Sequence, residues 1–240
     1  MPATLRLCAS ICAVGLAAAL LPGTAAQAAT GPTIRVSVAS DGSEGEFFGS
    51  SEASISADGR YVAFTSGDDL APNDPNYLDD VYLRDIKTGV TELISVGPEG
   101  ESILASSSQP SVSADGRYVA FAANADLNGG DEWLGGTYLR DRQAGTTTRL
   151  GPRTYWYDDG PDISPDGNFV VFSAVTDAVP EDTNFQDDVY LWQRSTGALS
   201  AISTGTDGET TFGDSTGLTS SDDGRYVTYS TDSVMLNGGV

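Results

Sequence analysis

The chain has 240 residues, with 12 basic and 34 acidic side chains, a formal net charge of −22 and no histidine. An acidic field of this size repels nucleic acid and anionic membrane surfaces, so neither is expected as a partner. Without histidine the chain has no Ser-His or Cys-His nucleophile pair and lacks the commonest zinc ligand.

The first 28 residues have the pattern of a secretory signal peptide. Arg6 precedes an unbroken small or apolar run at 7–21, and Ala26-Gln27-Ala28 supplies a small-x-small cleavage pattern. The run is shorter than the roughly 20 residues that cross a bilayer core. Both cysteines lie in this segment. We therefore predict a signal peptide at 1–28 and an exported mature part at 29–240, secreted or in the cell envelope, with no disulfide and no membrane insertion.

A nine-residue phrase occurs four times in the remaining chain. It reads Ser-Ala-Asp-Gly-Arg-Tyr-Val-Ala-Phe at 56–64 and at 113–121, with related forms at 164–172 and 221–229. The aspartates are separated by 57, 51 and 57 positions, a period close to the length of one propeller blade. Asp-Gly before an apolar run is a hairpin signal, because glycine adopts a positive φ without steric cost. The predicted structural turns are Asp58, Gly59, Asp115, Gly116, Asp166, Gly167, Asp223 and Gly224.

Each repeat predicts four antiparallel strands. The Asp-Gly turn joins a first strand to an apolar second strand, which suits a strand covered on both faces. Third strands are predicted at 80–85, 137–141 and 188–192, and fourth strands at 91–95, 147–150 and 199–203. Repeat units run from about 33 to 89, 90 to 145, 146 to 197 and 198 to 240, the last incomplete. We expect the chain to open with a lone fourth-type strand at 33–37.

The repeated phrase, followed by Asp-Val-Tyr-Leu-Arg-Asp at 80–85 and a Thr-Gly turn, resembles the TolB-like, WD-repeat-like β-propeller repeat. The resemblance covers nearly all of 33–240. It implies an all-β fold of about three and a half four-stranded blades, unclosed or incompletely closed, and a role in binding other proteins. The sequence contains no third strand for the last blade, and three interpretations are kept. The sequence is a truncated piece of a longer protein, another chain supplies the strand, or the array stays open. The edge strand at 225–230 is then predicted to self-associate.

Two loops between second and third strands share one polar pattern. The residues are Asp74, Asn76 and Asp80 in the first unit, and Asp182, Asn184 and Asp188 in the third. Alternating oxygen ligands are typical of calcium loops. Asp and Asn side chains also stabilise turns by bonding to their own backbone. Both interpretations, a calcium site and a turn, are kept; no other cofactor is predicted.

An aromatic cluster at Tyr155, Trp156 and Tyr157 lies beside two aspartates in the shortest loop between units. Such residues stack on sugars in binding surfaces, and they also pack over a blade rim as loop anchors. Both interpretations are kept here as well.

The function predicted from these features is a secreted, non-enzymatic interaction module that binds a protein or peptide. An Asp at the same turn of every unit has a structural role in every unit, and no residue is assigned as catalytic. Glycoside hydrolysis needs only two carboxylates, so a carbohydrate-binding or glycoside-active propeller is the alternative. A third hypothesis is a non-functional fragment of a longer propeller.

Overall fold

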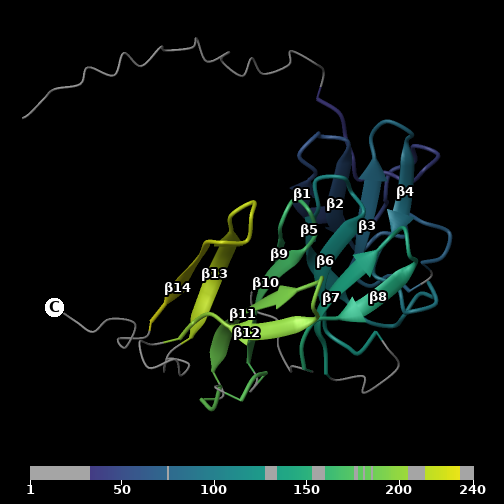
Figure 1. Ribbon diagram of the computed structural model, residues 1–240. Helices are drawn as coiled ribbons and strands as arrows, with labels where there is room; N and C mark the ends of the chain where they lie inside the picture. Colours follow the sequence, from purple (N-terminus) through teal and green to yellow (C-terminus); the bar gives the residue numbers. More distant parts are fainter. Residues whose placement is uncertain are drawn as a thin grey trace, which may run out of the picture. The chain divides into compact units, whose positions relative to one another are not determined.

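The computed structural model describes residues 33–74, 76–127, 134–152, 160–175, 178–180, 182–184, 186–204 and 214–232. The predicted signal peptide and the aromatic cluster at 155–157 lie outside these ranges. In the described part of the chain, no helix is long and apolar enough to span a membrane. The regular structure is a series of β-strands, labelled in Figure 1.

Three four-stranded antiparallel sheets follow one another along the chain, and each pairs its strands in sequence order. The first contains β1 (Ser50–Ile55), β2 (Tyr61–Ser66), β3 (Asp80–Asp85) and β4 (Val90–Leu93). The second contains β5 (Ser107–Val112), β6 (Tyr118–Ala123), β7 (Gly136–Asp141) and β8 (Thr146–Arg149). The third contains β9 (Asp162–Ile163), β10 (Phe169–Val175), β11 (Asp187–Gln193) and β12 (Ala198–Ala201).

A two-stranded sheet of β13 (Ser215–Ser220) and β14 (Val227–Thr231) follows the third blade. Neighbouring sheets are in contact along the chain, through β2 with β5, β6 with β9, and β10 with β13. The predicted all-β array of three blades and a half-blade is confirmed, and the described strands do not close into a ring.

The second strand of each blade forms the centre of the core, because its run of apolar residues is covered on both faces. Every residue of β6 is buried, as are Val62 to Ser66 of β2. One apolar cluster joins β2 and β3 of the first blade to β6 of the second, and another joins β6 and β7 to β10 of the third. Burial between sheets therefore stabilises the array.

The predicted lone strand at 33–37 is wrong. These residues adopt no strand, and the nearest β contact is an isolated bridge between Val38 and Glu44. A fourth strand needs the third strand of its own blade as a hydrogen-bonding partner, and the described residues before β1 include none. Val38 still takes the place of a preceding blade's end, because its carbonyl accepts from the Thr91 hydroxyl as the carbonyl of Val96 accepts from Thr147.

Candidate functional site

The Asp-Gly corner has the same hydrogen bonds in all four repeats. In the first, the Ser56 hydroxyl donates to Asp58 Oδ1 (2.7 Å), and the amide of Arg60 donates to the same oxygen (3.0 Å). The Tyr61 amide donates to Ser56 Oγ (2.9 Å), and Gly59 has a φ of +71°. The corners at Asp115, Asp166 and Asp223 repeat these contacts. The four aspartates therefore hold turns together.

In the later blades, an aromatic ring from the preceding blade packs directly against the corner glycine. A Cβ added to Gly116 would lie 2.2 Å from Cδ2 of Tyr61, and one added to Gly167 would lie 2.3 Å from Cδ2 of Tyr118. Gly224 lies against Phe169 in the same way. Glycine is thus required at these corners both for its positive φ and for the close approach of the ring.

Arginines after the third strands complete these junctions between blades. Arg142 lies over the Tyr61 ring (5.3 Å to the centroid) and donates to the Gly116 carbonyl (2.7 Å). It also donates from Nε and Nη2 to Glu92 of the first blade (2.9 and 2.7 Å). Arg194 repeats the ring contact at Tyr118 (4.5 Å). These contacts were not predicted, because the aligned position in the first repeat is an isoleucine and the pattern is therefore hidden in the sequence.

A second unpredicted contact lies in the first strands. Each of β1 and β5 contains an irregularity in its pairing, where Glu52 (φ 51°) and Gln109 (φ 55°) adopt the left-handed region. The Glu52 carboxylate accepts from the Gln109 amide of the next blade (2.8 Å) and from the Thr65 hydroxyl (3.0 Å). A β-bulge frees this amide from its own sheet, which makes it available to the neighbouring blade.

The polar residues of the 74–80 loop converge on the third strand. Asn76 donates through Nδ2 to Asp80 Oδ2 (3.2 Å), and Ser95 donates to Asp80 Oδ1 (2.5 Å). Asp74 accepts from the Tyr82 hydroxyl. Burial raises the pKa of Asp80 to about 8. Burial therefore favours the neutral form of this carboxyl far more than in an exposed aspartate.

The 182–188 loop of the third blade is built in the same way. Asn184 donates to Asp188 Oδ2 (2.8 Å), Ser203 donates to Asp188 Oδ1, and Asp182 accepts from the Tyr190 hydroxyl. Burial raises the pKa of Asp188. The structure thus brings together the two predicted sets of three residues, each within one loop.

These contacts are those that the turn interpretation predicts: the Asn76 side-chain oxygen also accepts from the Leu78 amide (2.7 Å). No group of three or more acidic, cysteine or histidine side chains is arranged to hold a metal within the described ranges. The calcium interpretation stays a prediction, and a calcium titration given in the Discussion tests it.

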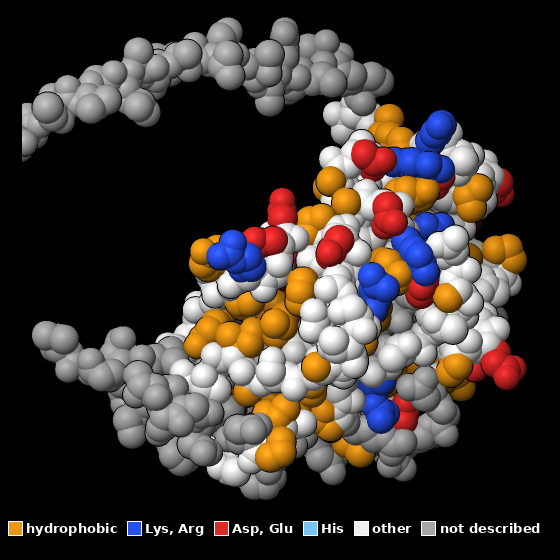
Figure 2. All heavy atoms as spheres, viewed as in Figure 1, with side chains coloured by type: hydrophobic (Ala, Val, Ile, Leu, Met, Phe, Trp, Pro, Cys, Tyr) orange, Lys and Arg blue, Asp and Glu red, His pale blue; other side chains and the backbone are white. Residues whose placement is uncertain are grey.

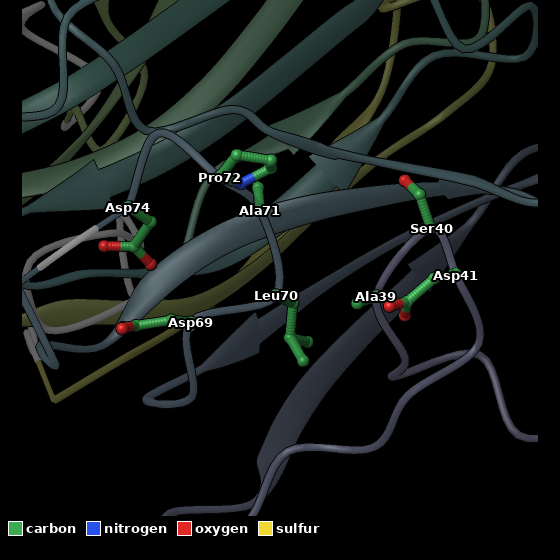
Figure 3. Close-up of a pocket in the computed structure, with 8 residues that line it drawn as sticks. All are labelled: Ala39, Ser40, Asp41, Asp69, Leu70, Ala71, Pro72 and Asp74. Atoms are coloured by element: carbon green, nitrogen blue, oxygen red, sulfur yellow. The ribbon is translucent and has the colours of Figure 1, made fainter.

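A pocket of about 550 Å³ lies beside the first of these loops. Figure 3 shows Asp69 and Asp74 on one side of it and Ser40 and Asp41 on the other, with Leu70 between them. Burial and the nearby Asp74 carboxylate raise the pKa of Asp69. The pocket therefore combines an apolar floor with carboxylates that lack a cationic partner among its lining residues.

Successive four-stranded antiparallel sheets, each with the same Asp-Gly corner and each in contact with the next, define this protein as an incomplete β-propeller array. Comparison with protein-family models and with curated proteins found no match.

Among solved structures, the chain is similar to TolB from Acinetobacter baumannii, with 17% identity over 80% of this chain and 42% of that one, and a TM-score of 0.47. It is similar to a protein reported as TolB from Agrobacterium tumefaciens, with 22% identity over 75% and 58% of the two chains and a TM-score of 0.45. A third is the β-propeller domain of the Trilobed protease from Pyrococcus furiosus, with 12% identity over 65% and 43% and a TM-score of 0.45. The chain spans less than two thirds of the length of each of these proteins.

Proposed function

We propose that the protein is exported and acts as a non-enzymatic interaction module, binding a protein or peptide that presents a basic side chain. The leader pattern at 1–28 supports export. The observation that carries the binding proposal is the pocket of Figure 3, where Asp41, Asp69 and Asp74 surround an apolar floor of Leu70 and Ala71.

Such a pocket favours lysine or arginine over other side chains for two reasons. The aliphatic stem of a long basic side chain packs on apolar surface while its charged head meets carboxylates. Burial raises the pKa of the Asp69 carboxyl, and a cation beside it favours the charged form. The net charge of −22 adds a long-range attraction for basic partners and increases their association rate.

The experiment uses a peptide array in which each sequence occurs in lysine, arginine and glutamate versions. We expect the full chain to bind basic peptides, and the Asp69→Asn variant to lose about tenfold in affinity, as for one charge-assisted contact. Asp222→Asn is the matched control, because Asp222 is exposed in the fourth repeat and the substitution removes the same charge. Equal affinity of both variants, or equal binding of the glutamate peptides, would contradict the proposal.

The carbohydrate alternative is separated by a glycan array and hydrolysis assays on the same preparation. Glycan cleavage that a single Asp→Asn substitution abolishes would replace the interaction module with a glycoside-active enzyme.

A further inference from the structure

We propose that a second pocket, which shares Ala71 and Pro72 with the pocket of Figure 3, binds a carboxylate of the ligand through the guanidinium of Arg140. The inference deepens the proposed function, because it names a second charged group that the peptide carries. Its choice of a peptide rests on that function, whereas the carboxylate site itself is argued from Arg140 alone.

The second pocket has a volume of about 380 Å³ and is lined by residues of the first two blades. The first blade supplies Val90 to Leu93, which form β4, and the second supplies Arg140 from β7. Because Ala71 and Pro72 line both pockets, the two pockets are neighbours. One short peptide can therefore place a group in each of them.

Arg140 is a buried cation with one edge unsatisfied. It is 8% exposed, and its only hydrogen bonds within the described part of the chain run from Nη1 to the Gly145 carbonyl (3.0 Å) and to Thr147 Oγ1 (3.1 Å). Nε is buried without a partner. Nη2 lies 4.0 Å from a Cβ placed on Gly100, which lines the pocket. A buried charge is costly unless it is paired, so the edge formed by Nε and Nη2 favours an acceptor.

Other arginines of these two blades use the same edge to hold a carboxylate, donating from both Nε and Nη2. The pairs are Arg60–Asp85, Arg117–Asp141 and Arg142–Glu92. Figure 2 shows basic side chains beside acidic ones in the part of the view where the first two blades lie. This edge matches a carboxylate in shape as well as in charge, so a carboxylate is the ligand group expected at Arg140.

The carboxylates that act on Arg140 through space are already engaged elsewhere. They belong to Glu92, Asp141 and Glu101. Their partners are Arg142 for Glu92, Arg117 for Asp141, and the Glu99 amide (3.0 Å) for Glu101. Burial lowers the pKa of the Arg140 guanidinium in spite of these charges, so they do not replace the solvent that it has lost. A carboxylate from outside the chain would do so.

The two pockets together select a peptide that carries both charges. The first is lined by three carboxylates, and the second presents the unpaired edge of Arg140. A free anion is repelled by the net charge of −22, whereas a segment with one basic group and one carboxylate has no net charge. The carboxylate is that of an acidic side chain or of the peptide C-terminus, and the experiment distinguishes these two sources.

Calorimetric titration of the full chain tests the proposal with short peptides that contain one lysine. In one arm the C-terminus is amidated, and a glutamate or a glutamine occupies successive positions around the lysine. In the other arm the glutamine peptides end in either a free or an amidated C-terminus at successive distances from the lysine. We expect at least one carboxylate form to bind at least tenfold more tightly than its neutral counterpart, as for a two-nitrogen contact with a carboxylate.

Arg140→Gln should abolish this gain, so that the carboxylate and neutral peptides bind equally. Arg225→Gln is the matched control, because it removes the same charge from a side chain that is 71% exposed in the fourth repeat, and it should keep the gain. A second pair of variants leaves Arg140 in place. Val90 is 51% exposed and lines the pocket, so Val90→Glu should cancel the gain by charge repulsion, whereas Val90→Gln should retain it.

Equal binding of all carboxylate and neutral peptides would overturn the proposal, and so would a gain that persists in Arg140→Gln or in Val90→Glu. Peptides in which glutamine replaces the lysine separate this inference from the proposed function. A carboxylate gain without any contribution from the lysine would contradict only the proposed function. Binding that depends on the lysine but not on the carboxylate would contradict only the site at Arg140.

Discussion

The glycines of the first two corners offer a test of how blades are joined, because their local sequences are identical over nine residues and only their neighbours differ. Gly59 and Gly116 have φ values of +71° and +69°. Replacing either by alanine places a side chain in the left-handed region, at a cost of about 1–2 kcal/mol. At Gly59 no atom of the described residues lies within 4 Å of the new methyl group.

At Gly116 the same methyl group would lie 2.2 Å from the Tyr61 ring, so the ring has to move. Overpacking of this kind costs about a further 1–3 kcal/mol. Movement of Tyr61 also weakens its contact with Arg142, which lies over the ring. We therefore expect Gly116→Ala to lower the free energy of unfolding by about 2–5 kcal/mol, against about 1–2 kcal/mol for Gly59→Ala.

The assay is urea unfolding followed by circular dichroism, at a protein concentration low enough to keep the chain monomeric. A double-mutant cycle isolates the ring contact: in a Tyr61→Ala background, Gly116→Ala should cost no more than Gly59→Ala does in the wild type. Equal costs for the two single variants, or a cost at Gly116 that survives removal of the ring, would refute the account of the junction.

Three further predictions concern charge. In the folded protein burial raises the pKa of Asp80 to about 8, above its ordinary 3.8, so its contribution to the free energy of unfolding falls as pH rises from about 4 to about 8. The Asp80→Asn variant should therefore become more stable relative to the wild type across this window. A constant difference in stability from pH 5 to 9 would contradict this prediction. Arg142→Ala should lower the free energy of unfolding by about 1–2 kcal/mol in thermal unfolding, because it removes the two hydrogen bonds to Glu92 and the one to the Gly116 carbonyl. Arg35→Ala is the control, because Arg35 and its partner Glu44 are both exposed. This variant should change the free energy of unfolding by less than about 0.5 kcal/mol. Millimolar calcium should leave the unfolding temperature unchanged, because the loop oxygens already accept internal hydrogen bonds; a rise of several degrees would establish the calcium interpretation.

The corner phrase by itself determined the architecture. Its hairpin turn depends on interactions within six residues, from the Ser56 hydroxyl to the Tyr61 amide, and such local chemistry is visible in a sequence. The apolar run that follows fixes a strand buried on both faces, and the constant spacing to the third strand fixes the blade. The four-stranded antiparallel order could therefore be predicted without coordinates.

The contacts between blades were decided only by the tertiary structure. The Gly116–Tyr61 approach joins residues 55 positions apart in neighbouring repeats, and the Glu52–Gln109 bond joins positions 57 apart. In the sequence alone, Gly116 has the pattern of a turn glycine, Tyr61 that of a core aromatic residue and Glu52 that of a surface charge. None of these patterns identifies a partner in the next repeat. What selects the pairing is the distance at which two sheets can pack, and that distance is a property of the assembled blades.

The same reason explains the pocket and the failed strand at 33–37. Asp41 and Asp69 come together because the segment before β1 folds against the loop after β2, which no local pattern specifies. The 33–37 segment has a strand-like sequence, yet a strand exists only where a partner satisfies its backbone groups. The local sequence therefore determines the turns and strands of each repeat. The packing of neighbouring segments determines which strands form and which residues line the pocket.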